Sequence, residues 1–126
     1  MQRRLVATVR EAQKRATKVI RAGVDGRLVH AAVTECFEEA GYQTKHGKGG
    51  SVGFFHGTGH GLGLAVHDPG RMSAVVAYPL KQGSVMTVEP GLYYPGLGGC
   101  RWEDVVQVTA TGTRPLSKYP YNWEIK

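Results

Sequence analysis

Apolar side chains recur at helical spacing in the first third of the chain and then give way to short apolar runs divided by glycine and proline. Over residues 2–21 the apolar positions fall three and four residues apart, and Gly23 follows as a helix-ending residue. A second stripe with the same period starts after Asp25, which can cap a helix, and stops at Gly41. The pattern therefore predicts two amphipathic helices.

The rest of the chain carries strand patterns. A loop-like stretch at 45–50 is followed by runs rich in Val, Tyr and Thr, at residues 53–55, 74–78, 85–94 and 101–109. Glycine supplies 18 of 126 residues and lies mostly around these runs, which indicates tight turns rather than a linker. Helices first and strands afterwards, with no internal repeat, predict a single α+β domain over residues 1–126 with an antiparallel sheet.

Composition excludes several classes of protein. Hydrophobic residues make up 41% and charged residues 21% of the chain, which is typical of a globular domain and not of a disordered tail. Two cysteines are too few for a disulfide scaffold and indicate a reducing compartment. No apolar run approaches the length of a membrane span, and the apolar stretch 5–9 is too short for a signal peptide. We expect a soluble cytoplasmic domain.

The net charge of +6 lies entirely in residues 1–21, where seven basic residues face Glu11 alone. Such a helix can serve nucleic acid or an acidic membrane surface. No aromatic residue is interleaved to stack on bases, so we interpret the charges as a solvated helix face and expect neither partner. If nucleic acid were the ligand, neutralising Arg3, Arg4 and Lys14 would abolish binding.

Three of the five histidines fall within the glycine-rich segment 56–68. Its glycines make a helix improbable, and in an extended chain His56 and His60 point to the same side. A single histidine is more often a hydrogen-bonded structural residue than a ligand. The cluster shifts that balance, because glycine lets a substrate approach the backbone closely.

Two carboxylates complete the candidate chemistry. Glu89 precedes Pro90 in an apolar run, where a carboxylate is costly unless it is paired or bound to metal; an edge strand facing water is the alternative. Strand alternation places Arg101 and Glu103 on one face. They can form a surface ion pair, or Glu103 can bind a metal while Arg101 orients it. One imidazole and two carboxylates suit Mn, Co, Fe or Zn, but the spacing alone does not distinguish this set from scattered polar residues.

Three segments, HGTGHGLGLAVHD at 56–68, TVEPGLYYP at 87–95 and RWEDVVQVT at 101–109, resemble in order the motifs of the pita-bread metallopeptidases. That superfamily includes methionine aminopeptidases, Xaa-Pro aminopeptidases, prolidases and creatinases, and the resemblance is to the C-terminal half of its catalytic domain. His56, Gly91 and the Arg-x-Glu-Asp sequence are similar to the Xaa-Pro aminopeptidase and prolidase branch. The implied fold is half of the pita-bread (creatinase/aminopeptidase) fold.

The resemblance implies a metal-dependent hydrolysis of the peptide bond before proline. By motif, His60 matches a metal ligand, Glu89 a metal ligand that also transfers protons, and Glu103 the glutamate that bridges two ions. The implied cofactor is a divalent metal, Mn²⁺, Co²⁺ or Zn²⁺, with two ions in the complete fold. The implied substrate is an Xaa-Pro peptide.

The same resemblance assigns three supporting residues. His67 matches the histidine that contacts the substrate carbonyl and the developing oxyanion, and is counted as catalytic together with Glu89. His56 resembles a histidine near the substrate, and Arg101 an arginine behind the metal ligands.

One departure limits the implied activity. The family's two-metal site also needs two closely spaced aspartates from the N-terminal half of the fold, and this chain has only Asp25, Asp68 and Asp104, far apart. We expect a fragment, a split subunit or a degraded relative that holds at most one ion weakly and is inactive alone. The expected partner is a complementary N-terminal half or a second copy, because an isolated half exposes an apolar patch.

A non-catalytic peptide- or protein-binding pseudo-peptidase is the competing function. Such a domain has little reason to keep His60, His67, Glu89 and Glu103 together, so we favour descent from an active peptidase. The sequence leaves open the native metal and the choice between aminopeptidase and dipeptidase. Creatinase-like chemistry on a small substrate also stays open.

Overall fold

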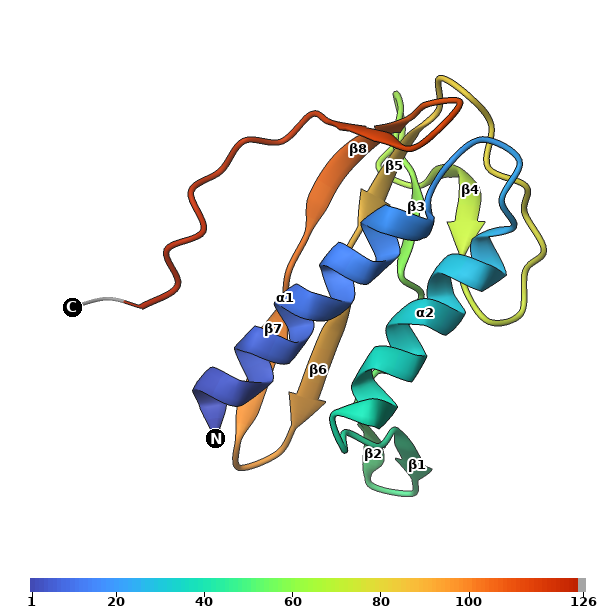
Figure 1. Cartoon of the computed structure of the whole chain (residues 1–126). Coiled ribbons are helices and arrows are strands. Elements are labelled where there is room, and N and C mark those ends of the chain that lie inside the picture. Colours follow the sequence, from blue (N-terminus) through green and yellow to red (C-terminus); the bar gives the residue numbers. More distant parts are fainter. Residues whose placement is uncertain (125–126) are drawn as a thin grey trace.

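The computed structural model describes residues 1–124, in which two helices lie side by side against one face of antiparallel sheet (Figure 1). The helices are α1 (Gln2–Val19) and α2 (Gly26–Glu39). The strands are β1 (Lys45–Gly47), β2 (Gly50–Val52), β3 (Gly59–Gly61), β4 (Asp68–Met72), β5 (Val85–Val88), β6 (Gly91–Tyr94), β7 (Gly98–Arg101), β8 (Asp104–Val108) and β9 (Thr113–Pro115). The predicted α+β order of helices followed by antiparallel strands is confirmed.

Both predicted helices form, and each buries one stripe of apolar side chains. The stripe of α1 is Leu5, Val9, Ala12 and Ala16, at spacings of four and three residues. The Asp25 carboxylate accepts a hydrogen bond of 2.9 Å from the Arg27 amide, so the predicted cap of α2 is present. Within the described residues, no helix is both long and apolar enough to cross a bilayer.

The main sheet has five strands in the order β4-β3-β5-β8-β9. Strand β5 pairs with β8 from Val85↔Gln107 to Val88↔Asp104, and the two-stranded ribbon β6-β7 continues beyond that point. Strand β4 forms an edge of the sheet, contains Pro69, and pairs with β3 through a register shift between His60 and Gly61. The residues between Val88 and Asp104 therefore connect the main sheet to the ribbon.

Two of the predicted strand runs are wrong. Residues 74–78 form bends and coil, and Val75 is 87% exposed, because β4 already occupies the sheet edge beside β3. This segment instead returns to α2, where the Tyr78 carbonyl accepts a hydrogen bond from Gly26. The run 53–55 shrinks to one bridge between Gly53 and Tyr93, and the expected loop at 45–50 belongs to the β1-β2 hairpin.

The other two runs form strands with shifted bounds. The run 85–94 divides into β5 and β6 at Glu89 and Pro90, since proline has no amide hydrogen to donate to a ladder. The run 101–109 divides as well: Arg101 ends β7, and β8 begins at Asp104. The predicted alternation holds, with Trp102 and Asp104 buried and Glu103 exposed.

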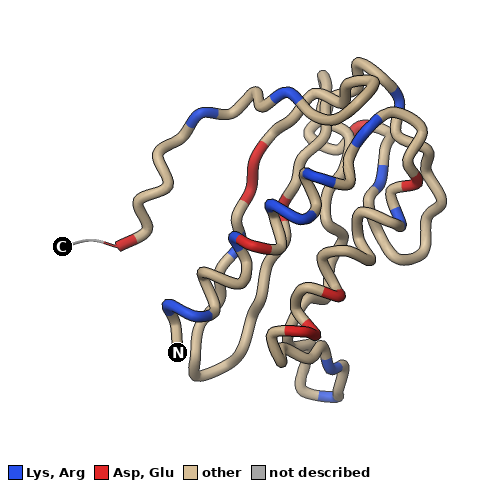
Figure 2. Tube along the Cα trace, in the orientation of Figure 1, with Lys and Arg blue, Asp and Glu red and all other residues tan. Residues whose placement is uncertain are grey.

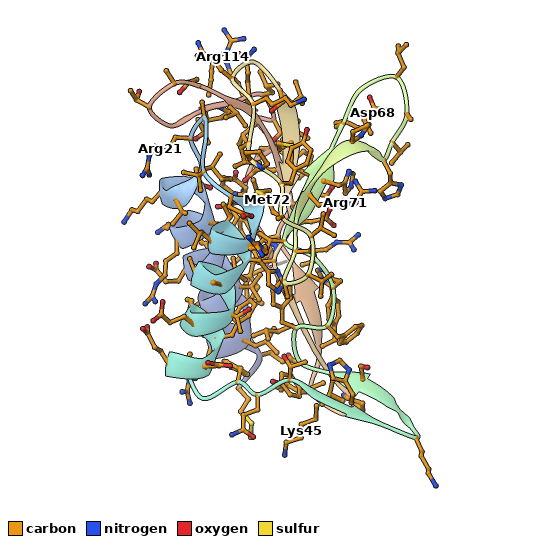
Figure 3. All side chains as sticks on the ribbon, turned by 90° about the vertical axis from the view of Figure 1, so that its right-hand side faces the viewer. Arg21, Lys45, Asp68, Arg71, Met72 and Arg114 are labelled. Atoms are coloured by element: carbon orange, nitrogen blue, oxygen red, sulfur yellow. The ribbon has the colours of Figure 1, made fainter. Side chains whose placement is uncertain are left out.

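The core lies between the helices and the sheet, and the two faces of the sheet differ accordingly. Met72 is buried on the side of the helices, whereas its neighbour Arg71 lies on the opposite side (Figure 3). Fully buried Leu80, Met86 and Leu92 continue the core. Burying an aliphatic side chain of this size stabilises a fold by roughly 1.5–3 kcal/mol, so this layer outweighs the exposed ion pairs.

Basic residues line α1, as predicted (Figure 2). Several of them contact protein groups: Arg3 pairs with Glu124 at 2.7 Å, and Arg15 with Glu39 at 2.7 Å. Arg10 lies over the ring of Trp102. These contacts reduce the charge that α1 can offer to an external polyanion.

Candidate active site

A cavity of about 310 Å³ brings the predicted histidines and Glu89 together. It lies where β3, β4 and the end of β5 meet, on the side of the sheet that carries Arg71 (Figure 3). Its lining consists of His56, Gly57, Gly59, His60, His67, Arg71, Glu89 and Arg101. Five of the six predicted site residues contribute to this lining, and the sixth, Glu103, lies outside it.

The glycine-rich segment is held tightly against β5. A Cβ at Gly59 would lie 1.9 Å from the Thr87 carbonyl oxygen, so any side chain there would push the strands apart. The Thr58 amide donates to Met72 at 2.7 Å, and the Thr58 carbonyl accepts from Glu89 at 2.7 Å. These hydrogen bonds fix the register between the histidine segment and Glu89.

His60 and Glu89 form the centre of the site. His60 Nε2 lies 3.2 Å from Glu89 Oε1, and both side chains are largely buried. Thr87 joins them, because its hydroxyl donates to Glu89 Oε1 at 2.9 Å and accepts from the His60 amide at 3.0 Å. The structure therefore brings these two predicted ligands into direct contact.

The tautomer of His60 determines what can lie between the two groups. His60 Nδ1 lies 2.8 Å from the Gly61 carbonyl oxygen, which can only accept, so Nδ1 carries a hydrogen. In a neutral ring the Nε2 lone pair then faces the Glu89 carboxylate. Two electron-rich atoms at 3.2 Å repel unless a cation, a proton or a metal ion, is shared between them. This donor pair therefore fits a divalent cation.

Glu103 is connected to the pair through Arg101. Arg101 Nη1 lies 3.8 Å from Glu89 Oε2, and Arg101 Nε lies 3.7 Å from Glu103 Oε2. The Arg101 and Glu103 side chains are 50% and 41% exposed. Across residues 1–124, no three His, Cys, Asp or Glu side chains are gathered closely enough to hold a metal ion. The structure thus joins His60 with Glu89 but does not bring Glu103 to the same point.

His67 lies at the exposed mouth of the cavity. Its ring centroid is 4.3 Å from that of His60, although the two residues are separated by the loop between β3 and β4. An imidazole there can reach a ligand bound at His60 from the solvent side.

His56 occupies the inner wall and reveals a residue that sequence reasoning missed. His56 Nδ1 lies 2.8 Å from the Gly57 carbonyl oxygen, so Nε2 accepts the hydrogen bond from the Tyr93 hydroxyl at 3.0 Å. Burial raises the pKa of Tyr93, which keeps this phenol a donor. Tyr93 follows Glu89 by four residues, but only the turn at Pro90 directs it back to the site.

Arg71 is a second residue that sequence reasoning missed. It pairs with His60 across the β3-β4 ladder and lines the cavity. Its guanidinium donates to the Asp68 and Gly70 carbonyl oxygens at 3.0 and 2.7 Å. Because no strand was predicted at residues 68–72, its position opposite His60 could not be foreseen.

Comparison with known proteins agrees with this geometry. The sequence model of metallopeptidase family M24 matches residues 1–110. An Xaa-Pro dipeptidase from Pyrococcus furiosus is 38% identical over 93% of this chain. The solved X-Pro aminopeptidase from Thermotoga maritima superposes over 95% of the chain with a TM-score of 0.84 at 37% identity. The prolidase from Pyrococcus furiosus superposes over 94% with a TM-score of 0.82 at 38% identity.

The chain belongs to metallopeptidase family M24. Within that family its fold is half of the pita-bread fold, and the predicted resemblance to the Xaa-Pro aminopeptidase and prolidase branch is confirmed. The chain spans about a third of the length of these relatives: 31% of the Pyrococcus furiosus dipeptidase and 32% of the Thermotoga maritima aminopeptidase.

Proposed function

We propose that this chain carries part of the active site of a metal-dependent hydrolase that cleaves Xaa-Pro peptide bonds, as an aminopeptidase or a dipeptidase. The observation that supports this most is the contact of 3.2 Å between His60 Nε2 and Glu89 Oε1, in the tautomer that needs a shared cation. Membership of family M24 supports the same chemistry. The free thiols of Cys36 and Cys100 suit a reducing, cytoplasmic location.

His60 and Glu89 would hold the cation, and Glu103 would join them once Arg101 no longer separates the two carboxylates. When bound, a divalent ion such as Mn²⁺, Co²⁺ or Zn²⁺ lowers the pKa of a coordinated water and polarises a carbonyl. Two donors in contact hold an ion weakly, so the chain alone would retain at most one. The remaining ligands would come from a complementary N-terminal half or from a second copy.

The other cavity residues have roles that follow from their positions. His67, exposed beside His60, can donate a hydrogen bond to the substrate carbonyl oxygen as negative charge develops there. Glu89 can take a proton and pass it to the leaving nitrogen. Arg71 supplies a cation whose hydrogen bonds go to backbone carbonyls, so its charge suits a substrate carboxylate and favours short peptides.

Titration of the purified chain with Mn²⁺ tests the metal centre. Binding is measured as the loss of the electron paramagnetic resonance signal of the free ion. We expect weak binding that His60→Ala and Glu89→Gln each reduce by at least tenfold. His46→Ala is the matched control, since His46 is exposed on the β1-β2 hairpin and bonds Ser51. Equal binding by the chain and by His60→Ala would refute the proposal.

Hydrolysis of an Xaa-Pro dipeptide tests whether the site is complete. We expect negligible turnover by the chain alone with added Mn²⁺, because the aspartates of the implied two-metal site are not in this sequence. Turnover at ordinary enzyme rates would show that these ligands suffice and would remove the need for a partner half.

A peptide-binding function without hydrolysis is the second candidate. It is favoured by Glu103 lying outside the cavity that holds His60 and Glu89. Binding of an Xaa-Pro peptide that is independent of Mn²⁺ and unchanged by Glu89→Gln would support this function over the peptidase.

A further inference from the structure

A buried carboxylate with three hydrogen-bond donors lies behind the candidate site rather than in it. Asp104, 7% exposed, accepts three hydrogen bonds: from Gln13 at 2.7 Å, from Ser117 at 2.7 Å and from Tyr121 at 2.5 Å. Short hydrogen bonds to a carboxylate are among the strongest in proteins. The donors come from α1 and from residues 117–124, here named the strap.

The strap also covers Trp102. The Tyr121 ring stacks on Trp102 at 4.6 Å between centroids, and the Arg10 guanidinium lies over both rings. The strap follows β9, is red in Figure 1, and contacts α1 through an ion pair of 2.7 Å between Glu124 and Arg3. Helix and strap therefore enclose Trp102 and Asp104 from the side opposite the cavity.

Asp104 lies at the end of the β5-β8 pairing, next to the two glutamates of the candidate site. Val88↔Asp104 is the last pair of β5 and β8, so the next residue on one strand is Glu89 and the preceding residue on the other is Glu103. The Trp102 amide donates to the Pro90 carbonyl at 3.1 Å and continues this pairing. By alternation along the chain, the exposed Arg101 and Glu103 side chains point to the opposite side from the buried Trp102 and Asp104 side chains.

Contacts on the cavity side do not fix Arg101 and Glu103. Both side chains are about half exposed, and Arg101 lies 3.7 Å from Glu103 and 3.8 Å from Glu89, beyond hydrogen-bond length. Contacts on the strap side are short and buried. The contacts on the strap side therefore determine the position of residues 101–104.

We propose that Asp104 is a positioning residue, which clamps residues 101–104 between α1 and the strap so that Arg101 and Glu103 face the site. The proposal rests on the proposed function only in treating Glu103 as a ligand. The Asp104 carboxylate raises the pKa of Tyr121, in agreement with a phenol that stays protonated and donates.

Tyr121→Phe removes one donor from Asp104 and keeps the aromatic ring. Tyr119→Phe is the matched control, because Tyr119 is on the same strap and 82% exposed. Amide hydrogen exchange of the full chain reports the clamp. We expect the Trp102 amide to exchange about tenfold faster in Tyr121→Phe. The Val108 amide, which lies at the far end of β8 and donates to the Ser84 carbonyl, should keep its rate.

Two results would overturn the clamp: no change at Trp102 relative to Tyr119→Phe, or an equal increase at Trp102 and Val108, which marks general destabilisation. Mn²⁺ titration then tests the link to Glu103, and we expect a severalfold weaker affinity in Tyr121→Phe than in Tyr119→Phe. Equal affinities overturn that link. If the unmodified chain binds no Mn²⁺, the proposed function fails, while the exchange experiment still decides the clamp.

Discussion

The imidazole Nδ1 of His30, on α2, lies 3.0 Å from the hydroxyl oxygen of Thr58, which sits between His56 and His60. The His30 ring also stacks on Phe54 at 5.0 Å, and Phe54 in turn meets the edge of His56. Thr58 is fully buried and its carbonyl binds the Glu89 amide. The second helix thus supports the histidine segment from the core side.

This position makes stability depend on pH near neutrality. Burial, and then the charge of His56, lower the pKa of His30 below its usual 6.5. The unfolded chain therefore binds a proton more readily, and the free energy of unfolding declines as the pH falls below about 6.5, until His30 is also protonated in the folded chain. Urea unfolding between about pH 7.5 and 5 measures the slope. In His30→Asn, which keeps a polar group near Thr58, we expect a smaller slope; an unchanged slope would contradict this assignment.

Two leucines provide a matched test of the core. Leu80 is 1% exposed, whereas Leu64, on the loop between β3 and β4, is fully exposed. We expect Leu80→Ala to lower the free energy of unfolding by about 2–5 kcal/mol, because it loses buried contacts and leaves a cavity. Leu64→Ala should change it by less than about 0.5 kcal/mol. Urea titration measures both, and similar losses would mean that the loop is covered in solution.

Gly59 should tolerate no side chain. The methyl group of Gly59→Ala would meet the Thr87 carbonyl oxygen at 1.9 Å, and β3 cannot move away from β5 without moving His60. We expect a loss of about 3 kcal/mol in thermal or urea unfolding and shifted imidazole resonances of His60. Gly112→Ala is the control, since a Cβ there meets no atom within 4 Å. A stable Gly59→Ala with unmoved His60 resonances would be inconsistent with this packing.

Asp25 should stabilise the fold only while it is ionised. Hydrogen bonds from the Arg27 side chain and amide lower its pKa from 3.8 to about 2. The contribution is complete above about pH 4 and is lost as the pH falls through about 2, because the unfolded carboxyl protonates first. Asp25→Asn keeps the cap but not the charge, so its melting temperature should fall below that of the parent chain at about pH 5 and converge with it in acid. A difference that persists in acid would point to the cap alone.

The helices could be predicted from sequence because their signal is local. Spacings of three and four residues identify the buried stripe, and Asp25 marks the start of α2 without knowledge of any partner. Strand β4, with the sequence Asp-Pro-Gly-Arg-Met, has neither alternation nor β-branched residues. It is a strand only because β3 lies beside it, and that neighbour is fixed by tertiary contacts.

The site shows the same division. Motifs predicted His60 and Glu89 as ligands, but their contact depends on the register of β3 on β5, which no local pattern encodes. Arg71 and Tyr93 reach the cavity through that register and the turn at Pro90. Glu103 stays outside the cavity lining in this structure, so its role as a ligand remains a prediction.

The edge strand β4 limits how another chain can attach to this sheet. Pro69 lacks an amide hydrogen, Gly70 takes a positive φ of 126°, and the bulge at His60 and Gly61 bends the neighbouring strand. An edge strand of this kind is a poor template for cross-β growth or for the addition of a strand from another chain. We therefore expect that another chain would not extend the hydrogen-bonded ladder at this edge of the sheet.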